Sequence, residues 1–133
     1  MIVFFDTNVL VSAVATRGLC ADVVNAAFAE HQVVVGETVL RELREVCREK
    51  LRLPAPLVDE LLAFLRLHAR VVKATGAPGL DIRDPKDRAM VAEALASTAE
   101  VLVTGDQELL EIRPPGKLKI TSPRGFWELL RAL

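Results

Sequence analysis

The sequence predicts an α/β protein, a three-layer α/β/α sandwich around a central and mainly parallel sheet. Short apolar runs rich in β-branched residues alternate along the chain with amphipathic stretches of helical periodicity. The stretches between the runs are long enough to hold the helical crossovers that parallel strands require. The length of 133 residues and the apolar content of 51% suit a single domain, residues 1–133, with one core.

The composition excludes several classes of protein. Seventeen Lys and Arg residues against eighteen Asp and Glu residues leave a net charge of −1, so no overall positive field attracts nucleic acid or anionic lipid. Asp6 and Asn8 interrupt the apolar N-terminal segment well short of the ~18 apolar residues of a membrane span. Cys20 and Cys47 lack the close spacing of metal or redox motifs, and we expect reduced core thiols in a cytoplasmic protein.

The first strand is expected at residues 2–5, a continuous apolar run typical of a strand that is covered on both faces. Helices over residues 7–14 and 19–31 follow, and Arg17-Gly18 breaks the chain between them. A second short apolar run predicts a strand at residues 33–35. The N-terminal third is therefore expected to form a strand, two helices and a parallel strand.

An amphipathic helix is expected over residues 37–51, because its Leu and Cys side chains recur on one face while its charges face water. The turn Pro54-Ala55-Pro56 leads into a helix over residues 57–68. A short strand at residues 71–72 precedes the longest loop, which opens with Gly76-Ala77-Pro78-Gly79 and runs to Asp84. Functional residues often border such loops.

The clearest helix starts at Asp84-Pro85, where the aspartate can cap the helix and the proline fits its first position. A buried strand is expected at residues 101–104, and Gly105-Asp106 then turns the chain into a short helix. Residues 118–121 are expected to form an edge strand. A helix over residues 123–133 closes the chain.

Two aspartates directly follow predicted strands. In open parallel sheets, ligands bind beyond the carboxyl ends of the strands, so Asp6 and Asp106 are candidates for chemistry. Each aspartate can equally be the N-cap of the helix that follows it. Both interpretations stay open from the sequence alone.

Glu42 lacks a basic residue at helical spacing. The residues three and four positions away on its helix are Thr38, Val39, Glu45 and Val46. Glu45, in contrast, has Arg41 and Arg48 at these spacings and is expected to lie on a charged, solvated face. A carboxylate at the border of the buried face costs free energy unless a cation meets it, although water can also be its partner.

Asp87 shares a helix face with Met90, Val91 and Ala94 and is expected to point toward the carboxyl edge of the sheet. Its alternative role is the second half of a capping box with Asp84. If Asp6, Glu42, Asp87 and Asp106 converge, four carboxylates repel one another unless protons or divalent cations neutralise them. Ligation by oxygen alone favours Mg²⁺ or Mn²⁺ over zinc.

The two histidines do not suggest a competing site. His31 and His68 lie at predicted helix ends, far from the strand ends that carry the aspartates. A paired-histidine acid–base site or a histidine–cysteine zinc site is therefore poorly supported, and we expect both side chains to be structural or solvated.

Four segments together resemble the PIN domain, in the branch of prokaryotic PIN proteins that are toxins of toxin–antitoxin pairs (VapC-like). The resemblance covers essentially the whole chain. Its carriers are FFDTNVLVSA, the glutamate of VLRELREV, RDPKDRAMVAEAL and VLVTGDQELL. It implies a PIN-like fold and a metal-dependent ribonuclease that holds one or two Mg²⁺ or Mn²⁺ ions.

Carried over by position, the resemblance places the metal-binding and catalytic carboxylates at Asp6, Glu42, Asp87 and Asp106. It places polar residues beside the metal at Thr7, Asn8 and Thr104. Candidates for contacts with an RNA substrate are Arg17, Arg83, Lys86 and Arg88. The resemblance also implies a cognate antitoxin as partner and allows a homodimer.

Other functions remain open at this point. A phosphotransfer protein would also place an aspartate after its first strand, but Asn8 stands where the haloacid-dehalogenase pattern requires a second aspartate. A receiver domain would require an acidic pair before the acceptor aspartate. Within the resemblance, an RNA-processing nuclease outside any toxin pair and a non-catalytic module that binds RNA or protein are the alternatives.

Overall fold

The computed structural model describes residues 1–74, 76 and 79–133. Its five strands form one sheet in the order β3-β2-β1-β4-β5, and every neighbouring pair is parallel. The strands are β1 Ile2–Phe5, β2 Gln32–Gly36, β3 Arg70–Val72, β4 Val101–Val103 and β5 Lys119–Thr121. The helices are α1 Thr7–Ala15, α2 Leu19–Glu30, α3 Glu37–Glu49, α4 Ala55–His68, α5 Pro85–Ala96, α6 Gln107–Leu110 and α7 Pro123–Arg131.

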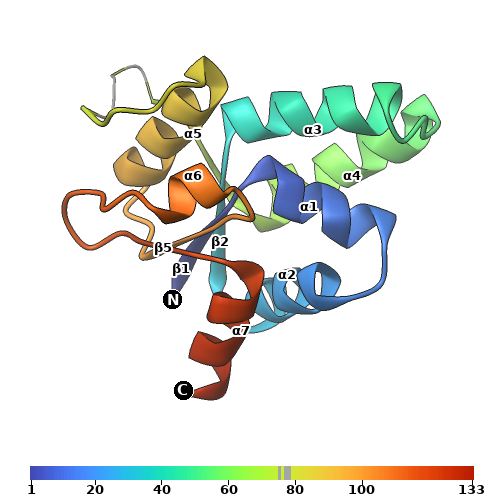
Figure 1. The fold of residues 1–133 in the computed structure, drawn as a ribbon. Helices are drawn as coiled ribbons and strands as arrows, with labels where there is room; N and C mark the ends of the chain where they lie inside the picture. Colours follow the sequence, from blue (N-terminus) through green and yellow to red (C-terminus); the bar gives the residue numbers. More distant parts are fainter. Residues whose placement is uncertain (75, 77–78) are drawn as a thin grey trace.

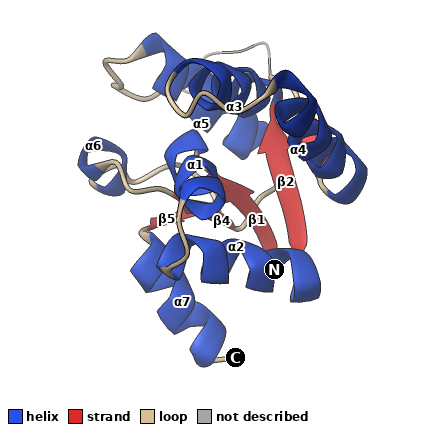
Figure 2. Cartoon of the chain, turned by 90° about the vertical axis from the view of Figure 1, so that its right-hand side faces the viewer, coloured by secondary structure: helices blue, strands red, loops and turns tan. Residues whose placement is uncertain are grey.

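The helices flank the sheet in the expected α/β/α arrangement (Figure 1). α2 and α5 both pack against β2, and α7 packs against α2. α3 and α5 lie at the end of the molecule toward which β2 points, whereas both termini lie at the opposite end (Figure 2). The carboxyl ends of the strands are thus overhung by α3 and α5.

β1 lies in the middle of the sheet and forms the centre of the core. Val3, Phe4 and Phe5 are at most 1% exposed, because helices cover both faces of the strand. Phe4 stands in register with Val34 on β2 and Leu102 on β4. The residue that follows β1 is therefore held at the centre of the carboxyl edge.

The predicted helices and strands are confirmed within a few residues, but one predicted turn is part of a helix start. Pro54-Ala55-Pro56 is the start of α4 and not a turn before it: Pro54 is the N-cap and the helix begins at Ala55. Prolines suit this place because the first helical N–H groups have no partner within the helix. In the predicted loop opening at Gly76-Ala77-Pro78-Gly79, residues 77 and 78 lie outside the described residues.

The remaining expectations concern single residues. Cys20 and Cys47 are free thiols, half-buried and buried respectively. His31 contacts the N-terminal amine through Nδ1 at 3.0 Å, and the His68 ring lies 4.5 Å from that of Phe64. Over the described ranges, no single helix is long and apolar enough to span a membrane; α1 and α2 pass that test only as a pair bent by 106°.

Candidate functional site

Asp6 is fixed at the centre of the carboxyl edge. Its backbone N–H donates to the Val103 carbonyl at 2.9 Å, which continues the pairing of β1 with β4. Its carboxylate Oδ2 accepts the Thr104 hydroxyl at 2.6 Å, and both side chains are buried, at 5% and 0% exposure. Asp6 makes no side-chain cap hydrogen bond to α1, although the N–H groups of Thr7 and Asn8 lower its pKa; the Thr104 bond is its stronger contact.

Thr104 connects the two aspartates that follow strands. Its hydroxyl donates to Asp6 and accepts the backbone N–H of Asp106 at 3.0 Å. The Asp106 carboxylate accepts the backbone N–H of Glu108 at 2.9 Å and caps α6. For Asp106 the capping role is therefore real, and it leaves the second carboxylate oxygen outside that bond.

Glu42 is half-buried on α3 and close enough to Asp6 to respond to its charge. Burial raises the pKa of Glu42, and the charges of Asp6 and Asp84 raise it further, whereas Lys86 and the Thr7 hydroxyl oppose the shift. Burial also raises the pKa of Asp6, against the Thr104 hydroxyl bond. The charged form of both carboxyl groups is therefore disfavoured.

Asp87 carries the largest perturbation at this edge. Burial, and then the charges of Asp84, Asp6, Asp106 and Glu42, raise its pKa from 3.8 to about 7. Asp84 caps α5 by accepting the Lys86 N–H at 2.7 Å, as predicted. Asp87 accepts no hydrogen bond from the described residues, so it does not complete a capping box.

The fold therefore brings Asp6, Glu42, Asp87 and Asp106 to one edge, from four separate segments of the chain. Among the described residues, no ion pair includes any of the four carboxylates. Nowhere in residues 1–74, 76 and 79–133 are three His, Cys, Asp or Glu side chains close enough to hold one metal ion together. Four carboxylates at one edge repel one another when they are charged, and a cation between them would remove that repulsion.

The chemistry of this donor set fits a hard divalent cation. All four groups offer only carboxylate oxygens, and the nearest polar neighbours are the Thr7 and Thr104 hydroxyls, both buried. Oxygen-only sites of this kind suit Mg²⁺ or Mn²⁺. Asn8, the third polar candidate, is exposed, so its place beside the site is on the solvent side.

The predicted basic candidates occupy different places. Arg83 and Lys86 are exposed and flank the start of α5, next to Asp84 and Asp87. Arg88 is exposed, but its Nη1 donates to the Ile82 carbonyl at 2.9 Å. Arg17 is exposed in the connection after α1, at the opposite end of that helix from Asp6.

Glu45 is exposed on the charged face of α3, as expected. Its ion-pair partner is not one of the two arginines at helical spacing, however: its Oε2 lies 3.9 Å from Nζ of Lys86, which comes from α5. Arg48 instead donates to the Leu53 carbonyl at 2.7 Å. The spacing rule considers only neighbours on the same helix, whereas α5 packs beside α3 and brings the Lys86 side chain to Glu45.

The sequence reasoning missed Glu93. This carboxylate on α5 is only 2% exposed and accepts the Thr38 N–H at the start of α3. Burial raises its pKa. The signal used for Glu42 would have found it, because Ala89, Met90, Ala96 and Ser97 offer no basic side chain at helical spacing.

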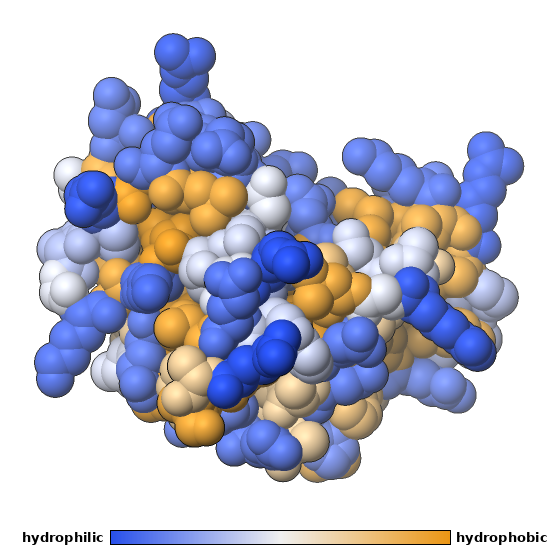
Figure 3. Space-filling model, turned by 60° about the horizontal axis from the view of Figure 1, so that its bottom comes forward, coloured by the Kyte–Doolittle hydropathy of each residue, from blue (hydrophilic) through white to orange (hydrophobic). Residues whose placement is uncertain are grey.

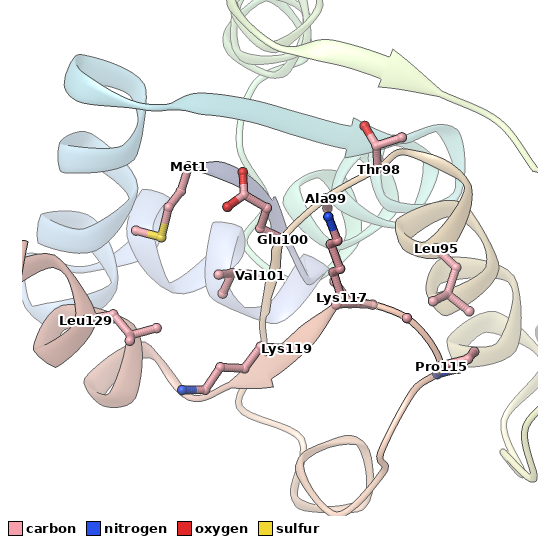
Figure 4. Close-up of a pocket in the computed structure, with 12 residues that line it drawn as sticks. Met1, Leu95, Thr98, Ala99, Glu100, Val101, Pro115, Lys117, Lys119 and Leu129 are labelled. Carbon is pink, nitrogen blue, oxygen red and sulfur yellow. The ribbon is translucent and has the colours of Figure 1, made fainter.

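A cavity of about 800 Å³ lies at the opposite edge of the sheet, between Met1, the end of α5 and β5 (Figure 4). Its one carboxylate is Glu100, which accepts the Ile2 N–H at 3.3 Å. Figure 3, in which the bottom of Figure 1 comes forward, shows hydrophobic surface interspersed with hydrophilic residues. This cavity lacks the converging carboxylates of the carboxyl edge and is not the candidate site.

The parallel five-stranded sheet between layers of helices matches the α/β/α fold of PIN-like proteins. The chain belongs to the PIN domain family, whose model matches residues 2–108. PIN domains are nucleases. The match includes all four carboxylates at the edge.

Solved structures share this fold at low sequence identity. One is VapBC2 from Rickettsia felis bound to a DNA fragment from their promoter, at 19% identity and a TM-score of 0.66, covering 92% of this chain and 98% of that one. Another is VapBC-1 from nontypeable Haemophilus influenzae, at 16% identity and a TM-score of 0.65, covering 93% and 99%. No curated protein matches the chain in sequence.

Proposed function

We propose that the chain is a ribonuclease that depends on Mg²⁺ or Mn²⁺ and hydrolyses RNA phosphodiester bonds as the toxin of a toxin–antitoxin pair. The observation that carries the proposal is the group of four carboxylates at the carboxyl edge, none of which has an ion-pair partner among the described residues, and of which Asp87 has a pKa of about 7. Such crowding of like charges is costly in a fold without a cation and typical of a functional site. Membership of a nuclease family supports hydrolysis.

Each side chain has a definite task in this proposal. Asp6, held by Thr104, provides a fixed oxygen ligand at the centre of the edge. Asp106 and Asp87 complete the ligand set, and Glu42 binds the cation or orients the attacking water. A divalent cation held there would neutralise the carboxylates, activate water and stabilise the charge on the phosphate oxygens.

RNA must approach from the solvent side of α5 and α6. Arg83 and Lys86 are our first candidates for phosphate contacts, because they are exposed beside the carboxylates. Each such contact neutralises one phosphate charge and makes binding weaken as salt rises. Arg17 and Arg88 are further candidates, with less support from their positions.

The antitoxin half of the proposal is supported by the VapBC structures that share the fold. It is also supported by apolar surface on α4, where Leu57, Phe64 and Leu67 are 53%, 47% and 78% exposed. A neighbouring reading frame for a small DNA-binding protein with a trailing amphipathic segment would test it. Without such a partner, an RNA-processing role in the cytoplasm is the second candidate, and the same test separates the two.

Cleavage of end-labelled RNA tests the catalytic half. We expect cuts with Mg²⁺ or Mn²⁺ that leave a 5′-phosphate and a 3′-hydroxyl, and no cuts in EDTA. Glu42→Gln should lower turnover by orders of magnitude. The matched control is Glu49→Gln, an exposed glutamate at the end of the same helix, because Glu45 holds Lys86 near the site. Full activity in EDTA, or ends with a 2′,3′-cyclic phosphate, would refute the proposal.

A further inference from the structure

We propose that Glu93 is a positioning residue, which caps α3 from α5 and thereby sets the place of Glu42 relative to Asp87. Glu93 belongs to α5, as Asp87 does, and its carboxylate meets the start of α3, the helix of Glu42. The inference rests on the proposed function, because it concerns the spacing of two proposed metal ligands.

The first observation is that α3 lacks a cap of its own. Its N-cap is Gly36, which has no side chain, and no side chain of the cap residue bonds to the first turn. The Thr38 N–H, one of the groups that a helix start leaves without a partner, lies 3.2 Å from Oε1 and 3.3 Å from Oε2 of Glu93. A residue on another helix thus performs the task that a Ser, Thr or Asp at position 36 would perform.

The second observation is that Gly36 makes room for this carboxylate. A Cβ atom at position 36 would collide with Oε1 of Glu93, would lie 2.8 Å from its Cδ and would lie 3.1 Å from Cζ of Phe4. Gly36 has extended backbone dihedrals that any residue adopts, with φ at −88°. Space for Glu93, and not backbone conformation, therefore explains the glycine.

The third observation is that the contact uses a buried carboxylate and lies close to the site. Glu93 is 2% exposed, and a buried carboxylate is costly unless a specific contact requires it. Along α5, Glu93 lies six residues from Asp87, about 9 Å; along α3, Thr38 lies one turn, about 6 Å, from Glu42. A displacement at the contact therefore moves Glu42 by a similar amount.

The far end of α5 is held separately. Arg70 on β3 donates from Nη2 to the Ser97 carbonyl, which follows the last residue of α5. α5 is consequently fixed to the sheet without Glu93. The specific effect of Glu93 is on α3, and a substitution there is expected to release the start of α3 while α5 keeps its place.

The test compares Glu93→Ala with Glu93→Gln, which keeps an acceptor oxygen for the Thr38 N–H. The control is Val23→Ala, a fully buried residue of α2 whose truncation lowers stability away from the site. We measure hydrogen exchange over residues 36–42 and the affinity for Mn²⁺ by calorimetry. Glu93→Ala should lose exchange protection at the start of α3 and weaken Mn²⁺ binding by about tenfold, the lower end for residues that orient metal ligands. Glu93→Gln should keep most of both, and Val23→Ala should change neither.

A double variant gives the clearest test, because the effect of Gly36→Ser on the melting temperature should reverse. Gly36→Ser alone should lower the melting temperature, because its Cβ collides with Glu93. In the Glu93→Ala background the same serine gains space and can cap Thr38, so it should raise the melting temperature and restore protection. This pair also carries the test if Glu93→Ala does not fold, since the double variant should then recover folding.

The inference is overturned if Glu93→Ala leaves exchange at residues 36–42 unchanged, or if it weakens Mn²⁺ binding no more than Val23→Ala does. It is equally overturned if Gly36→Ser has the same sign in both backgrounds. Failure of the wild type to bind Mn²⁺ would refute the proposed metal site instead. The exchange and melting data would still decide whether Glu93 holds α3.

Discussion

Neutralising Asp87 should stabilise the protein while it abolishes cleavage. The Asp87 pKa of about 7, against 3.8 for the unperturbed group, is a shift of about three pKa units, which corresponds to at most about 4 kcal/mol. Because the side chain is only half-buried, solvent screens part of this effect, and we discount it to about 2 kcal/mol. Asp87→Asn removes that cost in the absence of metal.

The stabilisation by Asp87→Asn depends on pH, because the Asp87 pKa differs between the folded and the unfolded state. Above pH 3.8 the unfolded chain has lost the Asp87 proton, whereas the folded protein keeps it up to about pH 7. The unfolded state therefore binds fewer protons, and the stability of the wild type falls as pH rises across this window. Asp87→Asn should melt near the wild type at about pH 4 and about 8 °C above it at pH 7.5.

Thermal melts in EDTA at both pH values measure this directly. The matched control is Asp22→Asn, another aspartate in the first turn of a helix, which is exposed on α2. It should not stabilise, because it loses only a favourable interaction with the helix dipole of about 0.5 kcal/mol. Excess Mn²⁺ at a hundred times its dissociation constant should add about 2.7 kcal/mol to the wild type and much less to Asp87→Asn. If Asp87→Asn in EDTA melts well below the wild type at pH 7.5, Asp87 is a structural residue and the site loses a member.

Three further predictions use different parts of the site. Thr104→Val should cost about 1–3 kcal/mol in urea denaturation and lower turnover, because the Asp6 carboxylate and the Asp106 N–H lose their shared hydroxyl, whereas Thr104→Ser should keep both. Mn²⁺ binding near pH 6.5 should release a proton from Asp87, seen in calorimetry as a heat that changes with the ionisation enthalpy of the buffer; a buffer-independent heat would contradict this. Lys86→Ala should raise the apparent pKa of the Glu42 limb in the pH–rate profile, because Lys86 favours the charged form of Glu42, and an unchanged profile would place Lys86 outside the site.

Much of the fold follows from local signals. The continuous apolar run of β1 predicts a strand covered on both faces, and Asp84-Pro85 predicts the start of α5 because capping and the fixed φ of proline act within a few residues. The acidic residues after β1 and β4 could be placed at one edge because parallel strands end together. For Glu42, the absence of a basic residue at helical spacing made it a candidate, and the structure places it within reach of the charge of Asp6.

The contacts that join distant segments could not be predicted. Asp6 meets Thr104 across 98 positions, and Glu37 pairs with Arg66 of α4 at 3.1 Å where the sequence offers only Arg41 on the same helix. Side-chain partners of this kind depend on how helices pack over the sheet, which periodicity does not determine. The contact between Glu93 and the start of α3 could not be predicted for the same reason. Its partner is the backbone N–H of Thr38, and a sequence does not indicate which acceptor such a group will meet.

Calorimetric titration of the metal-free protein with Mn²⁺ tests the central claim most directly. The account predicts saturable binding by the wild type at pH 7.5 that is lost or strongly weakened in Asp6→Asn, the ligand fixed at the centre of the edge. The control Asp22→Asn should bind Mn²⁺ as the wild type does. No binding by the wild type, or equal binding by Asp6→Asn, would contradict a metal site at the carboxyl edge of the sheet.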